Sequence, residues 1–262
     1  MKINIDECLS KSSIPRIIHQ THSLDMNELS PLFQSQINEV RSQNPTFEHR
    51  FYNNSQREEF IKHMYGDDML LVYQSINPEY GAARSDLFRY LLLYAEGGVY
   101  LDVKSGTSIP LESIISEDDE YLLSSWCYGK CGNLKECNGT CGIENWDWIL
   151  GTGFGEYQQW WIACSPMHPF MLSVIRKCLA NIKSYKYDPC DNTTFGKDGV
   201  LHLTGPIAYT QAIFPISDQY PHRFKFANFG GAFLYSFGST DGNKHADWSH
   251  YSRLTSPIVI HN

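Results

Sequence analysis

Apolar residues between positions 80 and 96 recur at helical spacing and predict one helix with a broad buried face. They are Leu87, Phe88, Leu91, Leu92 and Ala95. Ahead of them, Asn77 can cap the helix, and Pro78 can take its first position, where a missing N–H costs nothing. Gly97 suits the left-handed residue that closes a helix. We therefore expect one helix between Pro78 and Gly97.

A short buried strand is predicted directly after this helix. Gly98 allows the chain to reverse tightly, and residues 99–101 (Val-Tyr-Leu) form the strand. Asp102 then lies at the carboxyl end of the strand, where open α/β sheets bind their ligands. A carboxylate at this place can hold a divalent cation or sugar hydroxyls.

The charged residues of the predicted helix have a plainer interpretation as well. Arg84, Asp86 and Arg89 fit an ordinary solvated helix face, on which Asp86 and Arg89 form an i,i+3 ion pair. Residue types alone leave both interpretations open.

The first part of the chain alternates between strand and helix patterns. The predicted elements are a strand around residues 17–18, a helix within 29–43, a strand at 47–52, and a helix from a Ser55–Glu58 capping box to about residue 64. Such alternation predicts an α/β fold, with a mostly parallel sheet flanked by helices. The chain has no internal repeat, low-complexity tract or linker, so we expect one domain over residues 1–262.

The second part continues the same pattern. Strands are predicted at residues 120–126, 162–164, 224–228 and 258–260, with helices from 169 to about 180 and near 206. Pro169 suits a helix start, and His168 is expected to contact that start rather than to act in catalysis.

Charge and hydropathy exclude two classes of function. The net charge is −8, from 21 basic and 29 acidic residues without a basic block, which argues against nucleic-acid binding. No apolar run approaches the roughly 20 residues of a membrane-spanning helix. The first residues, MKINIDECLSKSS, are too polar for a signal peptide. We therefore expect a soluble, cytoplasmic protein without a transmembrane segment.

A cysteine-rich insertion interrupts the pattern at residues 127–141. Cys127, Cys131, Cys137 and Cys141 have the spacing C-x3-C-x5-C-x3-C. Four thiolates could bind a structural Zn²⁺, or form two disulfides in an oxidising compartment, or remain free thiols. In each case we expect a structural role rather than a catalytic one.

The run RSDLFRYLLLYAEGGVYLD resembles the core of the family 32 glycosyltransferases, the sugar-binding, DXD-containing group with fungal α-mannosyltransferases and bacterial capsule and lipopolysaccharide enzymes. Three further runs, IPRIIHQTH, WWIACSPMHP and TGP, resemble other parts of the same family. One departure stands out, because the family's Asp-x-Asp is Asp102-Val103-Lys104 here.

The resemblance implies a GT-A-like nucleotide-sugar-binding fold and a retaining transfer, here of a hexose. The donor would be a UDP- or GDP-linked sugar and the acceptor a glycan or other hydroxyl, as in polysaccharide biosynthesis. The resemblance implies catalytic roles for Asp102, Asp86 and Gln159, and donor binding by His19, Gln20, Arg84, Asp86, Gly98, Tyr100 and Lys104.

The resemblance also implies a Mn²⁺ or Mg²⁺ ion at the donor diphosphate, with Asp102, His261 and Asn262 as candidate ligands. Lys104 complicates this, because a charged ammonium has no lone pair to offer a metal. Three interpretations stay open. The first is that Asp102 and His261 suffice to hold the metal. The second is that Lys104 itself supplies positive charge to the diphosphate, and the third is that Lys104 points away from the site.

Two other functions remain as alternatives. The missing second Asp fits a catalytically degenerate protein that binds carbohydrate or nucleotide-sugar without turnover. A metal-dependent phosphoesterase is a weaker option, because two-metal sites need more clustered carboxylates than this sequence has.

Overall fold

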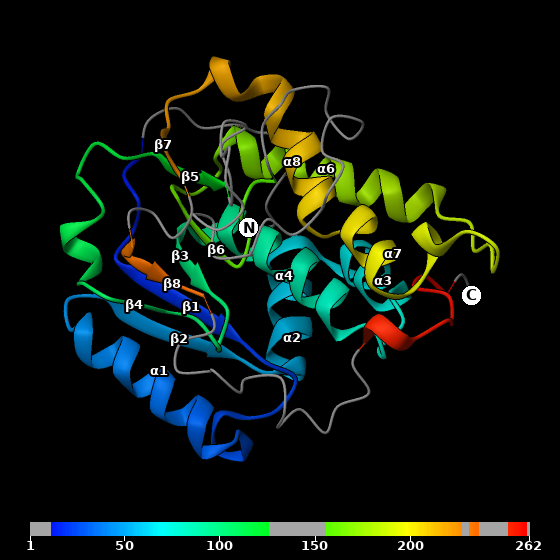
Figure 1. The fold of residues 1–262 in the computed structure, drawn as a ribbon, viewed down its shortest axis with the longest axis horizontal. Coiled ribbons are helices and arrows are strands. Elements are labelled where there is room, and N and C mark those ends of the chain that lie inside the picture. The colour runs from blue at the N-terminus through cyan, green and yellow to red at the C-terminus, as the bar shows by residue number, and fades with distance from the viewer. Residues whose placement is uncertain (1–11, 126–155, 227–230, 236–250, 261–262) are drawn as a thin grey trace, which may run out of the picture.

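The computed structural model describes residues 12–125, 156–226, 231–235 and 251–260 (Figure 1). Among these, six strands form the central sheet in the order β2-β1-β3-β6-β5-β7. The strands are β1 (Ile17–Thr21), β2 (Glu48–Tyr52), β3 (Gly98–Leu101), β5 (Tyr121–Ser125), β6 (Trp161–Cys164) and β7 (Arg223–Phe226). β1 runs parallel to β2 and β3, and β5 runs parallel to β7. β6 is antiparallel to both of its neighbours, so the sheet is mixed and mostly parallel, as predicted.

Alternate side chains of the strands enter two separate apolar layers, as the two-residue period of a strand requires. On one face, Tyr100, Ile162 and Tyr121 pack against the larger group of helices. These are α2 (Asn54–Tyr65), α3 (Asp67–Ser75), α4 (Gly81–Glu96), α6 (Pro169–Ser184), α7 (Gly196–Leu203) and α8 (Pro206–Ile213). On the other face, Val99 and Leu101 belong to the second layer.

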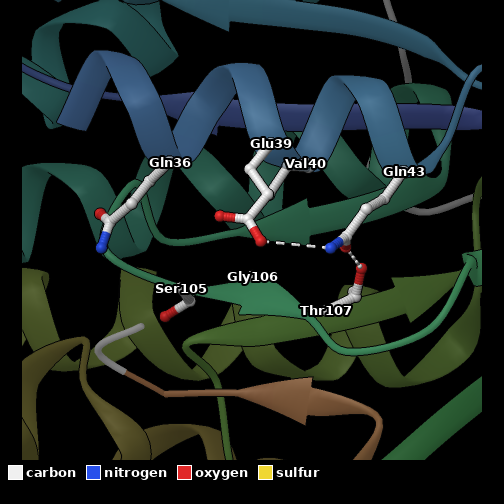
Figure 2. A pocket seen from close by; sticks show the side chains of 7 residues that line it. All are labelled: Gln36, Glu39, Val40, Gln43, Ser105, Gly106 and Thr107. Atoms are coloured by element: carbon white, nitrogen blue, oxygen red, sulfur yellow. Dashed lines mark hydrogen bonds between the residues drawn. The ribbon is translucent and has the colours of Figure 1, made fainter. Parts of the chain in front are cut away.

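Helix α1 (Pro31–Gln43) covers that second face, together with a short ladder of β4 (Gly106–Thr107) and β8 (Phe233–Leu234) (Figure 1). Polar side chains join α1 to β4 across a narrow gap (Figure 2). The Thr107 hydroxyl donates to Gln43 Oε1 at 3.1 Å, and the Gln43 amide donates to Glu39 at 3.3 Å. The bond from Thr107 holds β4, which directly follows residues 102–105, against α1.

Helix α4 is more deeply buried than its apolar periodicity predicts. Every residue from Asp86 to Tyr94 is buried, including Asp86 and Arg89. The helix touches the sheet, α2, α3, α6 and α7 at once, so it has little solvent-facing surface. A polar residue on such a helix needs a partner inside the protein.

The start of α4 differs from its prediction. The helix begins at Gly81 rather than at Pro78, because Asn77 forms a turn instead of a helix cap. Asn77 Oδ1 accepts from the Glu79 amide at 3.0 Å, and the Asn77 carbonyl accepts from the Tyr80 amide at 2.9 Å.

Two other local predictions were also wrong. The capping box of α2 joins Asn53 and Gln56, not Ser55 and Glu58. Residues 258–260 form only an isolated bridge, between Val259 and Ile76, rather than a strand. By contrast, the prediction at the start of α6 is confirmed, because His168 caps that helix by accepting from the Phe170 amide.

Two glycines make the tight connection from α4 to β3. Gly97 and Gly98 have φ angles of 65° and 96°, a backbone conformation that residues with a Cβ rarely adopt. A Cβ on Gly98 would lie 2.8 Å from the Ile17 carbonyl oxygen and 3.1 Å from His19 Nε2. The close approach of β3 to β1 therefore needs glycine at this position.

Among the described helices, none combines the length and the apolar content that crossing a membrane would require.

We predict that Gly98→Ala lowers the free energy of unfolding by about 2 kcal/mol or more, because the new methyl group meets backbone at a positive φ. Gly81→Ala is the matched control, since a Cβ there has nothing within 4 Å. It should change stability by less than about 1 kcal/mol. Urea denaturation of both variants measures the difference, and equal stabilities would contradict the packing argument.

Candidate active site

A buried guanidinium joins two carboxylates at the carboxyl end of β3. Arg89 Nη2 lies 3.1 Å from Asp86 Oδ1 and 3.3 Å from Asp102 Oδ1. Asp86 and Arg89 are one turn apart on α4, and Asp102 directly follows β3. The Asp86 and Arg89 side chains are 5% and 7% exposed, whereas that of Asp102 is 24% exposed. The pair on α4 is therefore not an ordinary solvated helix face, and Asp102 gives the group its opening to solvent.

The backbone around Asp102 is fixed on both sides. The Asp102 amide donates to the Trp160 carbonyl at 2.9 Å, which extends the antiparallel pairing of β3 with β6. The Ser105 amide donates to the Asp102 carbonyl at 2.8 Å and closes a tight turn over residues 102–105. The carboxylate consequently leaves the sheet at a defined place.

Tyr100 supports both ends of the ion pair between Arg89 and Asp102. Its ring lies under the Arg89 guanidinium at 4.5 Å, within the range of a cation–π contact. Its hydroxyl donates to Asp102 Oδ1 at 3.1 Å. One aromatic side chain therefore positions the cation and the exposed carboxylate together.

A second layer of polar groups comes from distant parts of the chain. Arg89 Nη1 donates to the Gln159 carbonyl at 2.7 Å, and the Tyr90 hydroxyl bonds the Gln159 side-chain oxygen. The Tyr90 hydroxyl also lies 2.9 Å from the Thr204 carbonyl. The Thr204 hydroxyl donates to Asp86 Oδ2 at 3.2 Å, so both oxygens of Asp86 are engaged.

Burial dominates the electrostatics of Asp86. Loss of solvent raises the pKa of its carboxyl to about 7, against the opposing attraction of Arg89. The negative charge of Asp102 adds to the rise. For Arg89, burial alone would lower the pKa, but Tyr100, Asp102 and Asp86 together outweigh it, so the pKa is raised and the guanidinium stays charged.

Lys104 lies on the same turn as Asp102. Its ammonium donates to the Tyr235 hydroxyl at 3.0 Å and stands 4.7 Å from the centre of that ring. Tyr235 in turn packs against Trp160, with ring centres 5.2 Å apart. Burial lowers the pKa of Lys104, but Asp102 and Tyr235 raise it by more. The side chain is therefore a cation beside Asp102.

The structure brings Asp86, Tyr100, Asp102 and Gln159 of the predicted residues together. Gln20 reaches the group only through its amide, which donates to the Asp102 carbonyl at 3.5 Å.

Two predicted donor-binding residues lie elsewhere. His19 is fully buried, and its Nε2 bonds the Gly97 carbonyl at 3.0 Å, beneath the turn that contains Gly98. Burial lowers its pKa to about 3, so the ring is neutral. Arg84 donates to the carbonyls of Ile76 and Gln74 at 2.8 and 3.3 Å. It therefore joins α4 to the end of α3 rather than facing Asp102.

Six predicted ligands cannot be placed. His261, Asn262 and the cysteines Cys127, Cys131, Cys137 and Cys141 lie outside the described residues. Their roles at a catalytic metal or a structural zinc stay predictions.

The sequence alone did not reveal the central role of Arg89. Its position three residues after Asp86 was visible, but that spacing is equally typical of a surface pair. Tyr90 and Thr204 lie in runs that resemble the family, but the sequence did not indicate their contacts with Gln159 and Asp86, which form only in the folded chain.

Comparison with known proteins agrees with this geometry. Residues 30–121, which include α4, β3 and Asp102, match the family "Glycosyltransferase sugar-binding region containing DXD motif". The chain is 23% identical to the "Initiation-specific alpha-1,6-mannosyltransferase" of Candida albicans over 257 residues, 94% of this chain and 62% of that protein. It is 31% identical to the "Inositol phosphoceramide mannosyltransferase 3" of Schizosaccharomyces pombe over 196 residues, 75% of this chain and 44% of that protein.

Residues 30–121 therefore resemble the sugar-binding region of this glycosyltransferase family, and the matched relatives include mannosyltransferases. The chain spans between about two fifths and three fifths of the length of the curated relatives that it matches. A solved structure described as "PaToxG Glycosyltransferase" shares its fold, with a TM-score of 0.50 and 15% identity over 78% of this chain and 69% of that one. The expected GT-A-like fold of the family is confirmed.

The described residues do not form a site for the divalent cation that the family's motif implies. No group of three or more His, Cys, Asp or Glu side chains gathers within the described parts of the chain. Both oxygens of Asp86 are engaged by Arg89 and Thr204, and Asp102 Oδ1 by Arg89 and Tyr100. The second motif position is Lys104, an ammonium without a lone pair. Within the described residues, the turn after β3 therefore carries a cation at the position where the family's motif has its second carboxylate.

We predict that Arg89→Met lowers the free energy of unfolding by about 3–5 kcal/mol, because it leaves two carboxylates near each other without their buried cation. Lys62→Ala is the comparison, since it removes an exposed ion pair with Asp67 and should cost at most about 1 kcal/mol. Chemical denaturation reports both values. A loss below about 1 kcal/mol for Arg89→Met would show that the buried pair is not a structural requirement.

We also predict a pH-dependent stability difference between the wild type and Asp86→Asn. The folded-state pKa of Asp86 is raised above its ordinary value, so its protonated form favours folding. That contribution is complete below about pH 4 and is lost as the pH rises through about 7. The wild type should therefore lose stability relative to Asp86→Asn between pH 4 and pH 7, as measured by urea denaturation. A constant difference would refute the raised pKa.

Proposed function

We propose that this chain is a retaining glycosyltransferase that moves a hexose from a UDP- or GDP-linked donor to a hydroxyl group of a glycan or another acceptor. The observation that supports this most directly is the Asp86–Arg89–Asp102 group at the carboxyl end of β3, inside the region that matches the family. The names of the two mannosyltransferase relatives make mannose the first hexose to test.

The group has the chemistry to recognise a sugar. Carboxylates accept hydrogen bonds from sugar hydroxyls, and a guanidinium donates through a fixed fork of N–H groups. Asp102, the more exposed carboxylate, faces the donor first. Asp86 and Arg89 are held in place by Thr204, Gln159 and Tyr100, so little reorganisation is needed when the donor arrives.

The reaction breaks the bond between the anomeric carbon and the diphosphate oxygen, and the electron pair leaves with the diphosphate. The acceptor hydroxyl bonds to the anomeric carbon on the same face and gives up its proton. An oxocarbenium-like centre with positive charge develops between the two steps. The carboxylate of Asp102 is placed to stabilise this charge electrostatically, without forming a covalent bond.

The proposed reaction predicts a large effect of Asp102→Asn, which keeps the side-chain shape but removes the charge. We expect the release of free UDP or GDP to fall at least about a hundredfold, as for loss of one preorganised group. The assay offers UDP- and GDP-hexoses, GDP-mannose first, with and without glycan acceptors. Glu59→Ala, which removes an exposed carboxylate on α2, is the control and should retain full activity.

Two results would count against the proposal. Equal nucleotide release by the wild type and Asp102→Asn would remove the proposed site. Donor binding by the wild type without release from any sugar in the panel would favour the alternative of an inactive, sugar-nucleotide-binding protein.

A further inference from the structure

The turn after β3 places a cation where the family's motif has its second carboxylate. The Ser105 amide closes the turn on the Asp102 carbonyl at 2.8 Å, and Val103 packs inward near Leu29. The Lys104 ammonium donates to the Tyr235 hydroxyl at 3.0 Å. The tight turn and the bond to Tyr235 therefore fix the position of the ammonium.

The replacement of Asp by Lys changes the local charge by the same amount as a divalent cation. In an Asp-x-Asp site, two negative charges and one M²⁺ ion give a formal sum of zero. In the Asp102-x-Lys104 pair, one carboxylate and one ammonium also give a sum of zero. A donor diphosphate would therefore meet a similar net charge at this turn without any metal.

The ammonium also has hydrogen-bonding capacity to spare. Lysine offers three N–H donors, and among the described residues the Tyr235 hydroxyl is the one hydrogen-bond acceptor that Lys104 reaches. The remaining donors suit phosphate oxygens, which lysine binds as a compact point charge. The face of the Tyr235 ring holds the cation nearby before a phosphate arrives, at 4.7 Å from the ring centre.

We propose that Lys104 replaces the divalent cation of the family: it binds the diphosphate of the donor, and transfer proceeds without a bound metal. The inference rests on the proposed function. As the bond between the anomeric carbon and the diphosphate oxygen breaks, the electron pair stays on the diphosphate, beside the Lys104 ammonium. The proton of the acceptor hydroxyl passes to the departing diphosphate or to water, so the reaction needs no redox partner.

The first test measures nucleotide binding, with UDP and GDP as the probes in isothermal titration calorimetry. The wild type should bind at least one of them equally well, within about twofold, in excess EDTA and in Mn²⁺. Lys104→Met should weaken that binding about 10- to 100-fold in EDTA, as expected for loss of a charge-assisted contact. Thermal melting of each variant shows whether it is folded.

The second test restores the family's motif with Lys104→Asp. This variant should bind the diphosphate and release nucleotide from the donor only when Mn²⁺ is added. It should also bind Mn²⁺ in an electron paramagnetic resonance titration in which the wild type does not. Lys197→Asp makes the same change of charge at an exposed position on α7 and should behave as the wild type does.

The outcomes separate this inference from the proposed function. A wild type that binds the diphosphate and transfers sugar only with Mn²⁺ overturns the role of Lys104 and leaves the glycosyltransferase intact. Lys104→Met with unchanged affinity overturns it as well. A wild type that binds neither UDP nor GDP under any condition contradicts the proposed function, and the inference with it.

Discussion

A buried charge needs a partner of opposite charge, and the arrangement of the site follows from this need of the Arg89 guanidinium. Taking an ion out of water costs several kcal/mol, which only close opposite charges and hydrogen bonds can offset. Arg89 finds one carboxylate on its own helix and a second at the end of the neighbouring strand. The pairing therefore links α4 to β3, and the place where Asp102 meets solvent is set by the need to neutralise Arg89.

The same need extends to segments far away in the sequence. Two carboxylates and one guanidinium have more hydrogen-bonding positions than they can satisfy among themselves. Gln159 ahead of β6 accepts from Arg89, and Thr204 between α7 and α8 donates to Asp86. The Tyr90 hydroxyl on α4 in turn contacts both Gln159 and Thr204. Each of these contacts also fixes the direction of a polar group, so the proposed donor would meet a preorganised site.

The sequence predicts much of this fold where local pattern and burial agree. The helix that starts at Pro169 and the strand before Asp102 have strong apolar patterns and short, defined ends, and both are present. The start of α4 was misplaced because Asn77 can cap a helix or close a turn equally well, and only contacts with the C-terminal segment decide between them. In the site, Asp102 was predictable from its strand, whereas the burial of Arg89 was not. Its depth depends on helices that pack around α4 from distant parts of the chain.

The short connection through Gly97 and Gly98 also affects the order in which the site can form. It brings Asp86, Arg89 and Asp102 together within one helix–turn–strand unit, so little chain entropy is lost when they meet. The bond from Thr204 to Asp86 closes a loop of 118 residues. Each doubling of loop length adds about 0.6 kcal/mol to the free energy of closing a loop. Closing the loop between Asp86 and Thr204 therefore costs about 2 kcal/mol more than bringing Arg89 and Asp102 together. The charged centre can therefore assemble as a local unit of folding, and the groups that enclose it can join later.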